Sequence, residues 1–275
     1  MKVYCIISDE RAYRSKSPAI FSTVLERMGI KGAYVPFQVS PGDVGQALQS
    51  LRILNIAGAN VTVPYKETVV PHMDILSEGA NIIGAINTIV RNGAELKGYN
   101  TNAIGFMDAL NEVGFDVEGK SALVFGTGGA AKAAVFILSW LRTKAIHVAG
   151  RNADRTTEIV TRFSGEAHSL KAIADNPPQA DIIVNATSVS NVDESSEMDA
   201  LVREMDVTGC ELVVDLNYER PDNFWEKMAR KQGAQFMDGL RPLAYQARRT
   251  LSLWTGLQVP PEAFIDALSQ NRKPH

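Results

Sequence analysis

The chain has few cysteines and no recognisable metal-binding pattern. Cys5 and Cys210 are its two cysteines, and they lie far apart in apolar, strand-like segments. Zinc and redox motifs require paired cysteines at short spacing. The histidines also lack a ligand spacing; they are His72, His147, His168 and His275. We therefore expect buried, reduced thiols in a cytoplasmic protein and no bound metal.

Long apolar runs and blocks of like charge are also missing. The N-terminal segment "VYCIIS" is too short for a signal sequence and is followed at once by charged residues. No run approaches the roughly 20 apolar residues that a membrane helix needs. The net charge of −3 is spread over 28 basic and 31 acidic residues. We expect a small-molecule partner rather than a nucleic acid or a membrane, and a monomer or homodimer.

Apolar strand-like segments alternate with helix-like segments along the chain. This alternation predicts an α/β protein with largely parallel sheets covered by helices. The pattern restarts at "KSALVFGTGGAAKAAVFILSW", and residues 239–256 are predicted to return to the first domain. We predict one domain of residues 1–102 and 239–275, a Rossmann-type domain of residues 103–238, and a cleft between them.

Two local signals occur within the first domain. Ser17 before Pro18 predicts a helix cap followed by the first helical position. Asn92-Gly93 lies between two strand-like segments and predicts a tight turn.

A glycine pattern opens the second domain. Gly126, Gly128 and Ala131 satisfy G-x-G-x-x-G/A directly after a strand at 122–125 and directly before a helix. Such glycines allow a tight turn and a close approach of a pyrophosphate to the backbone N–H groups of the helix. The alternative is a glycine turn made for packing, which the strand and helix on either side disfavour. The predicted cofactor turn comprises Gly126, Gly128, Gly129, Ala130 and Ala131.

The end of the next strand predicts which dinucleotide is bound. NAD sites usually carry an acidic residue there, whereas this chain has Gly150 and Arg151, and Asp154 lies too far along. Arg151, with Arg155 one helical turn later, suits a 2′-phosphate. We therefore predict NADP(H). The alternative, two solvated arginines at a helix start, competes more strongly for Arg155 than for Arg151.

Several short stretches resemble the shikimate dehydrogenase family in order and approximate spacing. They are "SKSPAIF", "GANVTVPYKE", "GAINTI", "GYNTN", "GTGGAAKA", "GRNADR", "NATS" and "DGLRPLAYQA". The resemblance covers essentially the whole chain, and "NVTVPYK" is its most specific element. It implies a substrate domain and an NADP-binding domain around a cleft. It also implies the interconversion of 3-dehydroshikimate and shikimate, in the chorismate pathway of aromatic amino acid biosynthesis.

The resemblance also implies roles for individual residues. Lys66 would be the catalytic lysine, where an ammonium stabilises a developing alkoxide. Ser15 and Ser17, near a helix start, would bind the substrate carboxylate. The substrate hydroxyls would contact Thr62, Asn87 and Gln246. The nicotinamide side would be lined by Asn185, Ala186, Thr187, Ser188, residues 215–218 and Gly239. The alternatives are a pure helix cap for Ser17 and a solvated lysine for Lys66.

The chain departs from the family at Asn102, where the family keeps an aspartate as the partner of the lysine. An asparagine forms hydrogen bonds but cannot take a proton or supply negative charge. Losing an acid–base group typically costs about 10²–10⁴ in rate. The missing charge should also lower the pKa of Lys66 by roughly one to three units. Lys66 would then act alone as the base in alcohol oxidation.

Further departures leave three interpretations open. Arg14 and Arg241 replace uncharged or weakly basic family residues, which suggests a more negatively charged substrate; the alternative is that both face water. The leading interpretation is an NADP-dependent oxidoreductase acting on a small polyhydroxylated carboxylate, with low activity on shikimate. The second is a non-catalytic or regulatory paralogue that binds NADP and a small acid. A methylenetetrahydrofolate dehydrogenase-like enzyme ranks third, because "SKSP" and "NVTVPYK" match the shikimate dehydrogenase family.

Overall fold

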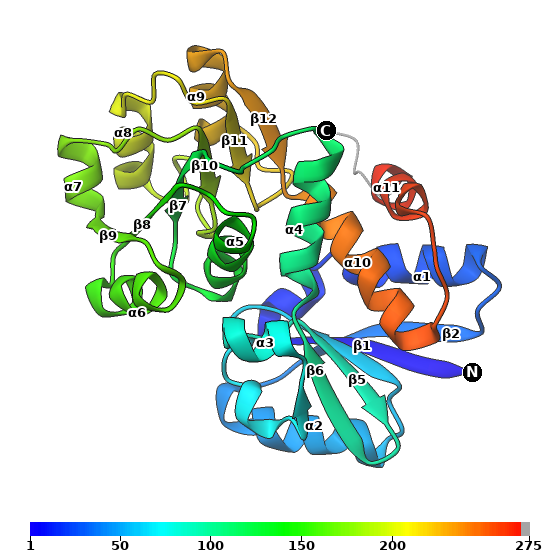
Figure 1. Ribbon diagram of the computed structural model, residues 1–275. Helices are drawn as coiled ribbons and strands as arrows, with labels where there is room; N and C mark the ends of the chain where they lie inside the picture. The colour runs from blue at the N-terminus through cyan, green and yellow to red at the C-terminus, as the bar shows by residue number, and fades with distance from the viewer. Residues whose placement is uncertain (271–275) are drawn as a thin grey trace. The chain divides into compact units, whose positions relative to one another are not determined.

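The computed structural model describes residues 1–270, which form two compact units (Figure 1). The first unit comprises Met1–Gly105 and residues 243–270, and the second comprises Phe106–Pro242. The chain passes between the units within two helices, α4 (Thr101–Glu112) and α10 (Leu240–Thr255). Within residues 1–270, no helix is long and apolar enough to cross a membrane.

The first unit contains a mixed sheet with the strand order β2-β1-β3-β5-β6-β4. Its strands are β1 (Lys2–Ser8), β2 (Gly32–Gln38), β3 (Gly58–Val61), β4 (Ile75–Leu76), β5 (Thr88–Asn92) and β6 (Glu95–Tyr99). β1 is parallel to β2 and β3, whereas β5 is antiparallel to β3 and β6. The expectation of a largely parallel sheet is therefore wrong for this unit. β5 enters the sheet antiparallel to β3, and the Asn92-Gly93 turn, where Gly93 has a φ of 60°, then reverses the chain as a hairpin into β6.

The sheet of the first unit is covered by helices and short 3₁₀ segments. The helices are α1 (Ser17–Arg27), α2 (Val44–Ile53), α3 (Glu78–Ile83), α11 (Pro261–Gln270) and parts of α4 and α10; the 3₁₀ segments are Glu10–Arg14, Pro41–Asp43 and Val70–His72. Trp254 of α10 stacks on Tyr4 at a centroid distance of 4.6 Å and donates its indole N–H to the Ile89 carbonyl (3.0 Å). Gly58 makes room for this ring, because a Cβ there would lie 2.1 Å from Trp254 Nε1. These contacts fix α10 on the sheet, and Gln246 lies on the same helix about two turns earlier.

Helix α1 begins differently from the prediction. Lys16 occupies the N-cap position, and Ser17 is the first helical residue. The predicted cap at Ser17 is therefore wrong. Ser15 Oγ accepts the Ser17 N–H at 3.1 Å, which satisfies this donor without a hydroxyl at the cap position. The buried Ser17 side chain instead hydrogen-bonds Tyr34.

The second unit contains a parallel sheet with the strand order β12-β11-β10-β7-β8-β9. Its strands are β7 (Ser121–Phe125), β8 (Ala145–Gly150), β9 (Glu166–Ser169), β10 (Ile182–Asn185), β11 (Leu212–Asp215) and β12 (Gln235–Asp238). The central strands are almost entirely apolar, as expected where helices cover both faces. Because the strands are parallel, the ends of β7, β8, β10, β11 and β12 meet along one edge, where this class of fold places its ligands.

Helices cover both faces of this parallel sheet (Figure 1). They are α5 (Gly129–Trp140), α6 (Ala153–Phe163), α7 (Leu170–Asp175), α8 (Ser196–Glu204) and α9 (Phe224–Gln232). Leu123, Phe125 and Ile183 point to one face and pack with buried side chains of α7, α8 and α9. The alternate strand residues point to the other face, where α5 and α6 pack through Phe136 and Phe163.

Candidate functional site

Lys66 follows strand β3 at the end of a tight turn. The turn is closed by a hydrogen bond from the Tyr65 N–H to the Thr62 carbonyl (3.0 Å), and its Val63–Pro64 peptide is cis. The Lys66 carbonyl accepts the Ile86 N–H at 2.8 Å, which ties the turn to the segment that leads into β5. The backbone at Lys66 is therefore held at both ends of the turn, and the side chain starts from a fixed position.

The environment of Lys66 makes its ammonium form easier to deprotonate than that of an exposed lysine. The side chain keeps some solvent exposure but is surrounded largely by protein atoms. This desolvation lowers the pKa of Lys66 from 10.5 to about 8. Within residues 1–270, no carboxylate contributes an opposing shift. The cause of this shift is desolvation, whereas the sequence prediction attributed a lowered pKa to the missing carboxylate, and that prediction stays untested. An amine with this pKa can both accept and donate a proton near neutral pH.

Asn87 connects two other predicted site residues, Asn102 and Gln246, with Thr101, which was not predicted. Its Nδ2 lies 2.8 Å from Thr101 Oγ1, 3.1 Å from Asn102 Oδ1 and 3.0 Å from Gln246 Oε1. Its Oδ1 accepts the Thr101 N–H at 2.6 Å. An amide NH₂ has two protons, so these three acceptors share them. A substrate hydroxyl can therefore replace one acceptor without leaving a donor of Asn87 unpaired.

Three threonine hydroxyls form a buried hydrogen-bonded group that contacts this amide cluster through Thr101. Thr88, Thr101 and Thr250 are buried, and each pair of their Oγ1 atoms lies 2.9–3.0 Å apart. Sequence reasoning missed the contribution of Thr88 and Thr250. One signal was available, because Thr250 follows Gln246 by four residues on α10 and therefore lies on the same helical face.

Asn102 lies in the first turn of α4. Asn100 caps this helix, since its Oδ1 accepts the Ala103 N–H at 3.1 Å and its Nδ2 donates to the Ala85 carbonyl at 3.0 Å. The positive end of the helix dipole favours a carboxylate in this turn. Asn102 presents an uncharged amide there, and its Oδ1 accepts from Asn87. The surroundings of residue 102 therefore favour an oxygen that accepts a hydrogen bond, but the side chain there carries no charge.

The two predicted carboxylate-binding serines lie close together at the start of α1. Ser17 is buried, whereas Ser15 is partly exposed and accepts the Ser17 N–H. Thr62 is partly exposed, and its N–H donates to the Ile7 carbonyl at 3.2 Å. All seven residues predicted for substrate and catalysis belong to the first unit: Ser15, Ser17, Thr62, Lys66, Asn87, Asn102 and Gln246.

The glycine turn in the second unit has the features that a pyrophosphate site needs. Gly126 has a φ of 117°, and a Cβ there would lie 2.8 Å from the Ala186 carbonyl oxygen. Gly128 is the N-cap of α5, and a Cβ there would meet nothing within 4 Å. Gly129 and Ala130 form the partly exposed first turn, while Ala131 is buried. The first N–H groups of α5 therefore face an open approach, so these residues fit a dinucleotide phosphate.

Arg151 and Arg155 lie at the start of α6. Asn152 caps this helix through a hydrogen bond from the Arg155 N–H to its Oδ1 (2.9 Å). Arg151 is exposed, and Arg155 is partly buried. Gly150 lies at the end of β8, and a side chain at this position would clash, because its Cβ would lie 2.6 Å from Thr127 Cγ2. Arg151 is therefore the first side chain after β8 that can reach a bound group.

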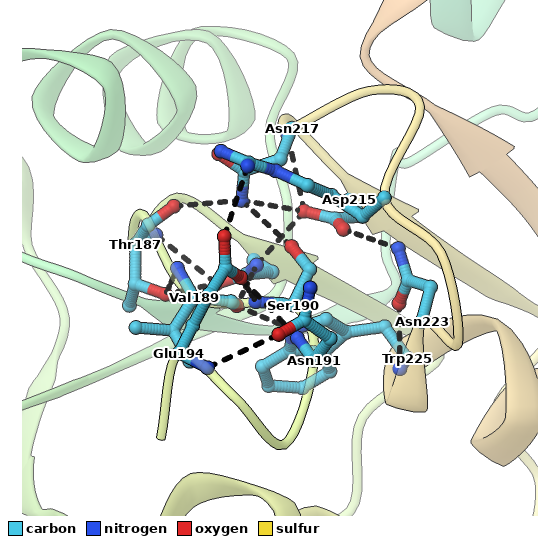
Figure 2. Close-up of polar contacts among 11 residues, drawn as sticks. Thr187, Val189, Ser190, Asn191, Glu194, Asp215, Asn217, Asn223 and Trp225 are labelled. Atoms are coloured by element: carbon cyan, nitrogen blue, oxygen red, sulfur yellow. Dashed lines mark hydrogen bonds and ion pairs between the residues drawn. The ribbon is translucent and has the colours of Figure 1, made fainter.

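A buried polar network occupies the ends of β10 and β11 (Figure 2). Asp215 accepts from Asn185 Nδ2 at 2.8 Å, Asn217 Nδ2 at 3.0 Å and Asn223 Nδ2 at 2.6 Å. Burial raises the pKa of Asp215 although these hydrogen bonds oppose the rise. Thr187 N–H and Oγ1 both donate to Asn185 Oδ1, which shapes the following loop. Sequence reasoning named the two strand ends but missed Asn223 as the third amide partner.

The remaining predicted cofactor residues lie beside this network. Ser188 is exposed on the loop after β10. Gly239 follows β12 and is buried, and a Cβ there would lie 2.3 Å from the Leu216 carbonyl oxygen. Its N–H donates to the Asn217 carbonyl at 2.9 Å. Gly239 therefore permits close backbone packing next to the network.

The structure places the two unusual arginines differently. Arg241 pairs with Glu112 at an Nη1–Oε1 distance of 2.6 Å, so its charge is already matched by a carboxylate of the same unit. Arg14 is exposed at the end of the first 3₁₀ segment. The ion pair of Arg241 gives it a partner other than a substrate, and the exposure of Arg14 agrees with the alternative that it faces water, so the anion-binding hypothesis stays a prediction.

Together, the fold and the site define a class of protein: a two-unit α/β oxidoreductase with a Rossmann-type unit. Residues 9–89 match the family described as "Shikimate dehydrogenase substrate binding domain", and residues 108–238 match "Shikimate / quinate 5-dehydrogenase". The chain belongs to the shikimate dehydrogenase family.

Named relatives and solved structures agree with this assignment. The shikimate dehydrogenase (NADP(+)) of Halothermothrix orenii is 33% identical over 94% of this chain and 92% of its own length. That of Caldanaerobacter subterraneus is 36% identical over 88% of each chain. The crystal structure of the Aquifex aeolicus shikimate dehydrogenase superposes with a TM-score of 0.87, at 29% identity over 98% of this chain and 97% of that one. The Thermus thermophilus enzyme, in complex with NADP(H) and shikimate, gives a TM-score of 0.85 at 30% identity over 98% and 99%.

Proposed function

We propose that this protein catalyses the NADP-dependent interconversion of an alcohol and a ketone on a small polyhydroxylated carboxylate, 3-dehydroshikimate/shikimate or a relative. The observation that carries the proposal is Lys66, whose pKa is lowered to about 8 within a unit that also holds the Asn87 cluster. The Thermus thermophilus enzyme, whose structure is a complex with NADP(H) and shikimate, and the Halothermothrix orenii shikimate dehydrogenase (NADP(+)) support the choice of cofactor and substrate class.

Polar side chains of the first unit would bind the substrate. The hydroxyls of Ser15 and Ser17 suit its carboxylate, because they lie at the N-terminal end of α1, where the helix dipole favours an anion. Asn87 and Gln246 suit its ring hydroxyls, because they already exchange donors and acceptors with one another. Thr62 adds a partly exposed hydroxyl.

Lys66 would move the proton. In alcohol oxidation its neutral Nζ takes the proton of the reacting hydroxyl, and in ketone reduction its ammonium returns that proton to the alkoxide oxygen. NADP(H), when bound, supplies the hydride acceptor or donor. The ammonium form also stabilises negative charge on the oxygen during the transfer. Asn102 would orient Asn87 and the substrate but would not share the proton.

The proposed proton transfer predicts the pH dependence of the rate. Below its pKa of about 8, Lys66 is protonated and cannot act as a base. The kcat/KM for alcohol oxidation should therefore rise about tenfold per pH unit up to that pKa and level off above it. Ketone reduction should show the opposite trend and decline above the pKa. Initial rates of alcohol oxidation and ketone reduction, measured from below to above pH 8, would test this pH dependence. Parallel pH profiles in the two directions would contradict it.

We also propose that Arg151 selects NADP(H) by binding the 2′-phosphate. Loss of a charge-assisted bond of roughly 1.5–3 kcal/mol should raise the KM for NADP⁺ about 10–100-fold in Arg151→Ala and leave the KM for NAD⁺ unchanged. Arg162→Ala, at the other end of α6, is the matched control. Steady-state kinetics with both cofactors would check the result. An equal rise in KM for NADP⁺ and NAD⁺ would show that Arg151 does not bind the 2′-phosphate.

A second candidate function follows from Asn102. A family member without the carboxylate partner of its lysine can retain both binding surfaces and lose turnover, as a non-catalytic paralogue that binds NADP and a small acid. Assays of NADP⁺ and NAD⁺ reduction with shikimate, quinate and related acids separate the two. Binding of NADP⁺ and an acid without turnover of any of them would favour this second function.

We place the proposed enzyme in the cytoplasm. Cys5 and Cys210 are both free and buried. Burial raises their pKa values to about 12 and about 11, so neither is a reactive thiolate. Such inert thiols are compatible with a reducing compartment.

A further inference from the structure

Strand pairing at one edge of the parallel sheet brings together three side chains that are separated in the sequence. β8 and β9 are parallel neighbours, with His147 opposite Glu166 and Ala149 opposite His168. Side chains two residues apart on a strand point to the same face, so Glu166 and His168 share the face on which His147 lies. β9 is the edge strand of this sheet.

The potential ligand atoms of these side chains converge. His147 Nδ1 lies 3.0 Å from His168 Nε2 and 3.4 Å from Glu166 Oε2, and the last two atoms are 3.9 Å apart. Tetrahedral ligands about 2.0–2.2 Å from a zinc ion lie roughly 3.3–3.6 Å from one another. Only small side-chain shifts would therefore bring the three atoms to metal-binding distance.

The three side chains differ in solvent exposure in a way that suits an accessible metal site. The side chains of His147 and His168 are 13% and 22% exposed, so the rings are held in place, whereas Glu166 is 71% exposed. An ion can enter past the carboxylate, and the open side leaves room for water as a fourth ligand. Two imidazoles and one carboxylate favour zinc-like transition metals over Mg²⁺ or Ca²⁺, which prefer oxygen ligands.

We propose that His147, Glu166 and His168 form a binding site for Zn²⁺ or a similar divalent transition metal. The site would join edge strand β9 to β8 and stabilise the second unit. It uses none of the residues assigned to substrate, proton transfer or cofactor. The prediction of no bound metal rested on sequence spacing, and this proposal replaces it. The alternative is that the two rings only share a hydrogen bond.

Titration of Zn²⁺ into the full-length chain, after treatment with a chelator, tests the proposal. Isothermal calorimetry should show about one ion per chain, and His168→Gln should bind at least about 100-fold more weakly. Glu166→Gln, at an exposed position, provides a second variant that should weaken binding. His72→Gln, an exposed histidine of the first unit, is the control and should bind as the unaltered chain does.

Two further readouts separate a built site from surface binding. Zn²⁺ should raise the Tm of the unaltered chain and of His72→Gln, but not that of His168→Gln. Co²⁺ should give the strong visible absorption of a four-coordinate ion with the unaltered chain. The same absorption should be missing with His168→Gln. Equal Zn²⁺ affinity in the unaltered chain and both site variants, or a Co²⁺ spectrum of the hydrated ion, would overturn the proposal.

Discussion

Asn102→Asp is expected to oxidise shikimate with a kcat about 10²–10⁴-fold higher than the chain with Asn102. The substitution keeps the size of the side chain, and one carboxylate oxygen can accept the Asn87 hydrogen bond that Asn102 Oδ1 now accepts at 3.1 Å. The first turn of α4 also favours the new negative charge. Steady-state rates of NADP⁺ reduction with shikimate and quinate would measure the gain.

The same substitution should shift the pH profile. The family resemblance implies that residue 102 is the partner of Lys66, and a nearby carboxylate favours the ammonium form, so the pKa of Lys66 should rise from about 8 by roughly one to three units. Asn111→Asp is the matched control, because it adds the same charge at an exposed position later on α4. A similar rise in kcat in Asn102→Asp and Asn111→Asp would indicate a general effect of the added negative charge. An unchanged rate in Asn102→Asp would mean that the surrounding substitutions have redirected the pocket.

Lys66→Met should lower kcat by about 10²–10⁴-fold with little change in KM. Methionine keeps an unbranched side chain of similar length but has no proton to exchange. The rise in rate toward pH 8 should disappear as well, because Lys66 is the group assigned to that pKa. Pre-steady-state and steady-state rates of alcohol oxidation would measure the loss.

The control for Lys66→Met is Lys31→Met, which removes an exposed lysine of the same unit. Its kcat and pH profile should match those of the unaltered chain. Circular dichroism and thermal unfolding would show whether either variant is misfolded. If Lys66→Met turns over substrate as fast as Lys31→Met, Lys66 is not the proton carrier and the proposed mechanism is wrong.

Much of the fold could be predicted from local patterns. The near-continuous apolar strands predicted the parallel sheet of the second unit, and Gly126 and Gly128 predicted the turn before α5. These predictions succeeded because hydrophobic period and glycine conformation act within a few residues. The first sheet was harder, since its mixed direction depends on how β5 pairs with β3.

Side-chain partners were less accessible to sequence reasoning. Ser17 was predicted to cap a helix, but Ser15 accepts its N–H instead. Arg241 was considered for anion binding, but it pairs with Glu112. Each depends on where a second group lies in space, and sequence spacing does not report that position.

The sequence by itself determined the family and the parallel Rossmann-type sheet of the second unit, because these depend on residue identity and local pattern. Only the tertiary structure decided that Asn87 shares its donors among Thr101, Asn102 and Gln246, and that His147 meets Glu166 and His168. It also decided the lowered pKa of Lys66, which is caused by desolvation. Hydrogen bonds, ligand geometry and desolvation all depend on distances between residues that the fold, rather than the order of the chain, brings together.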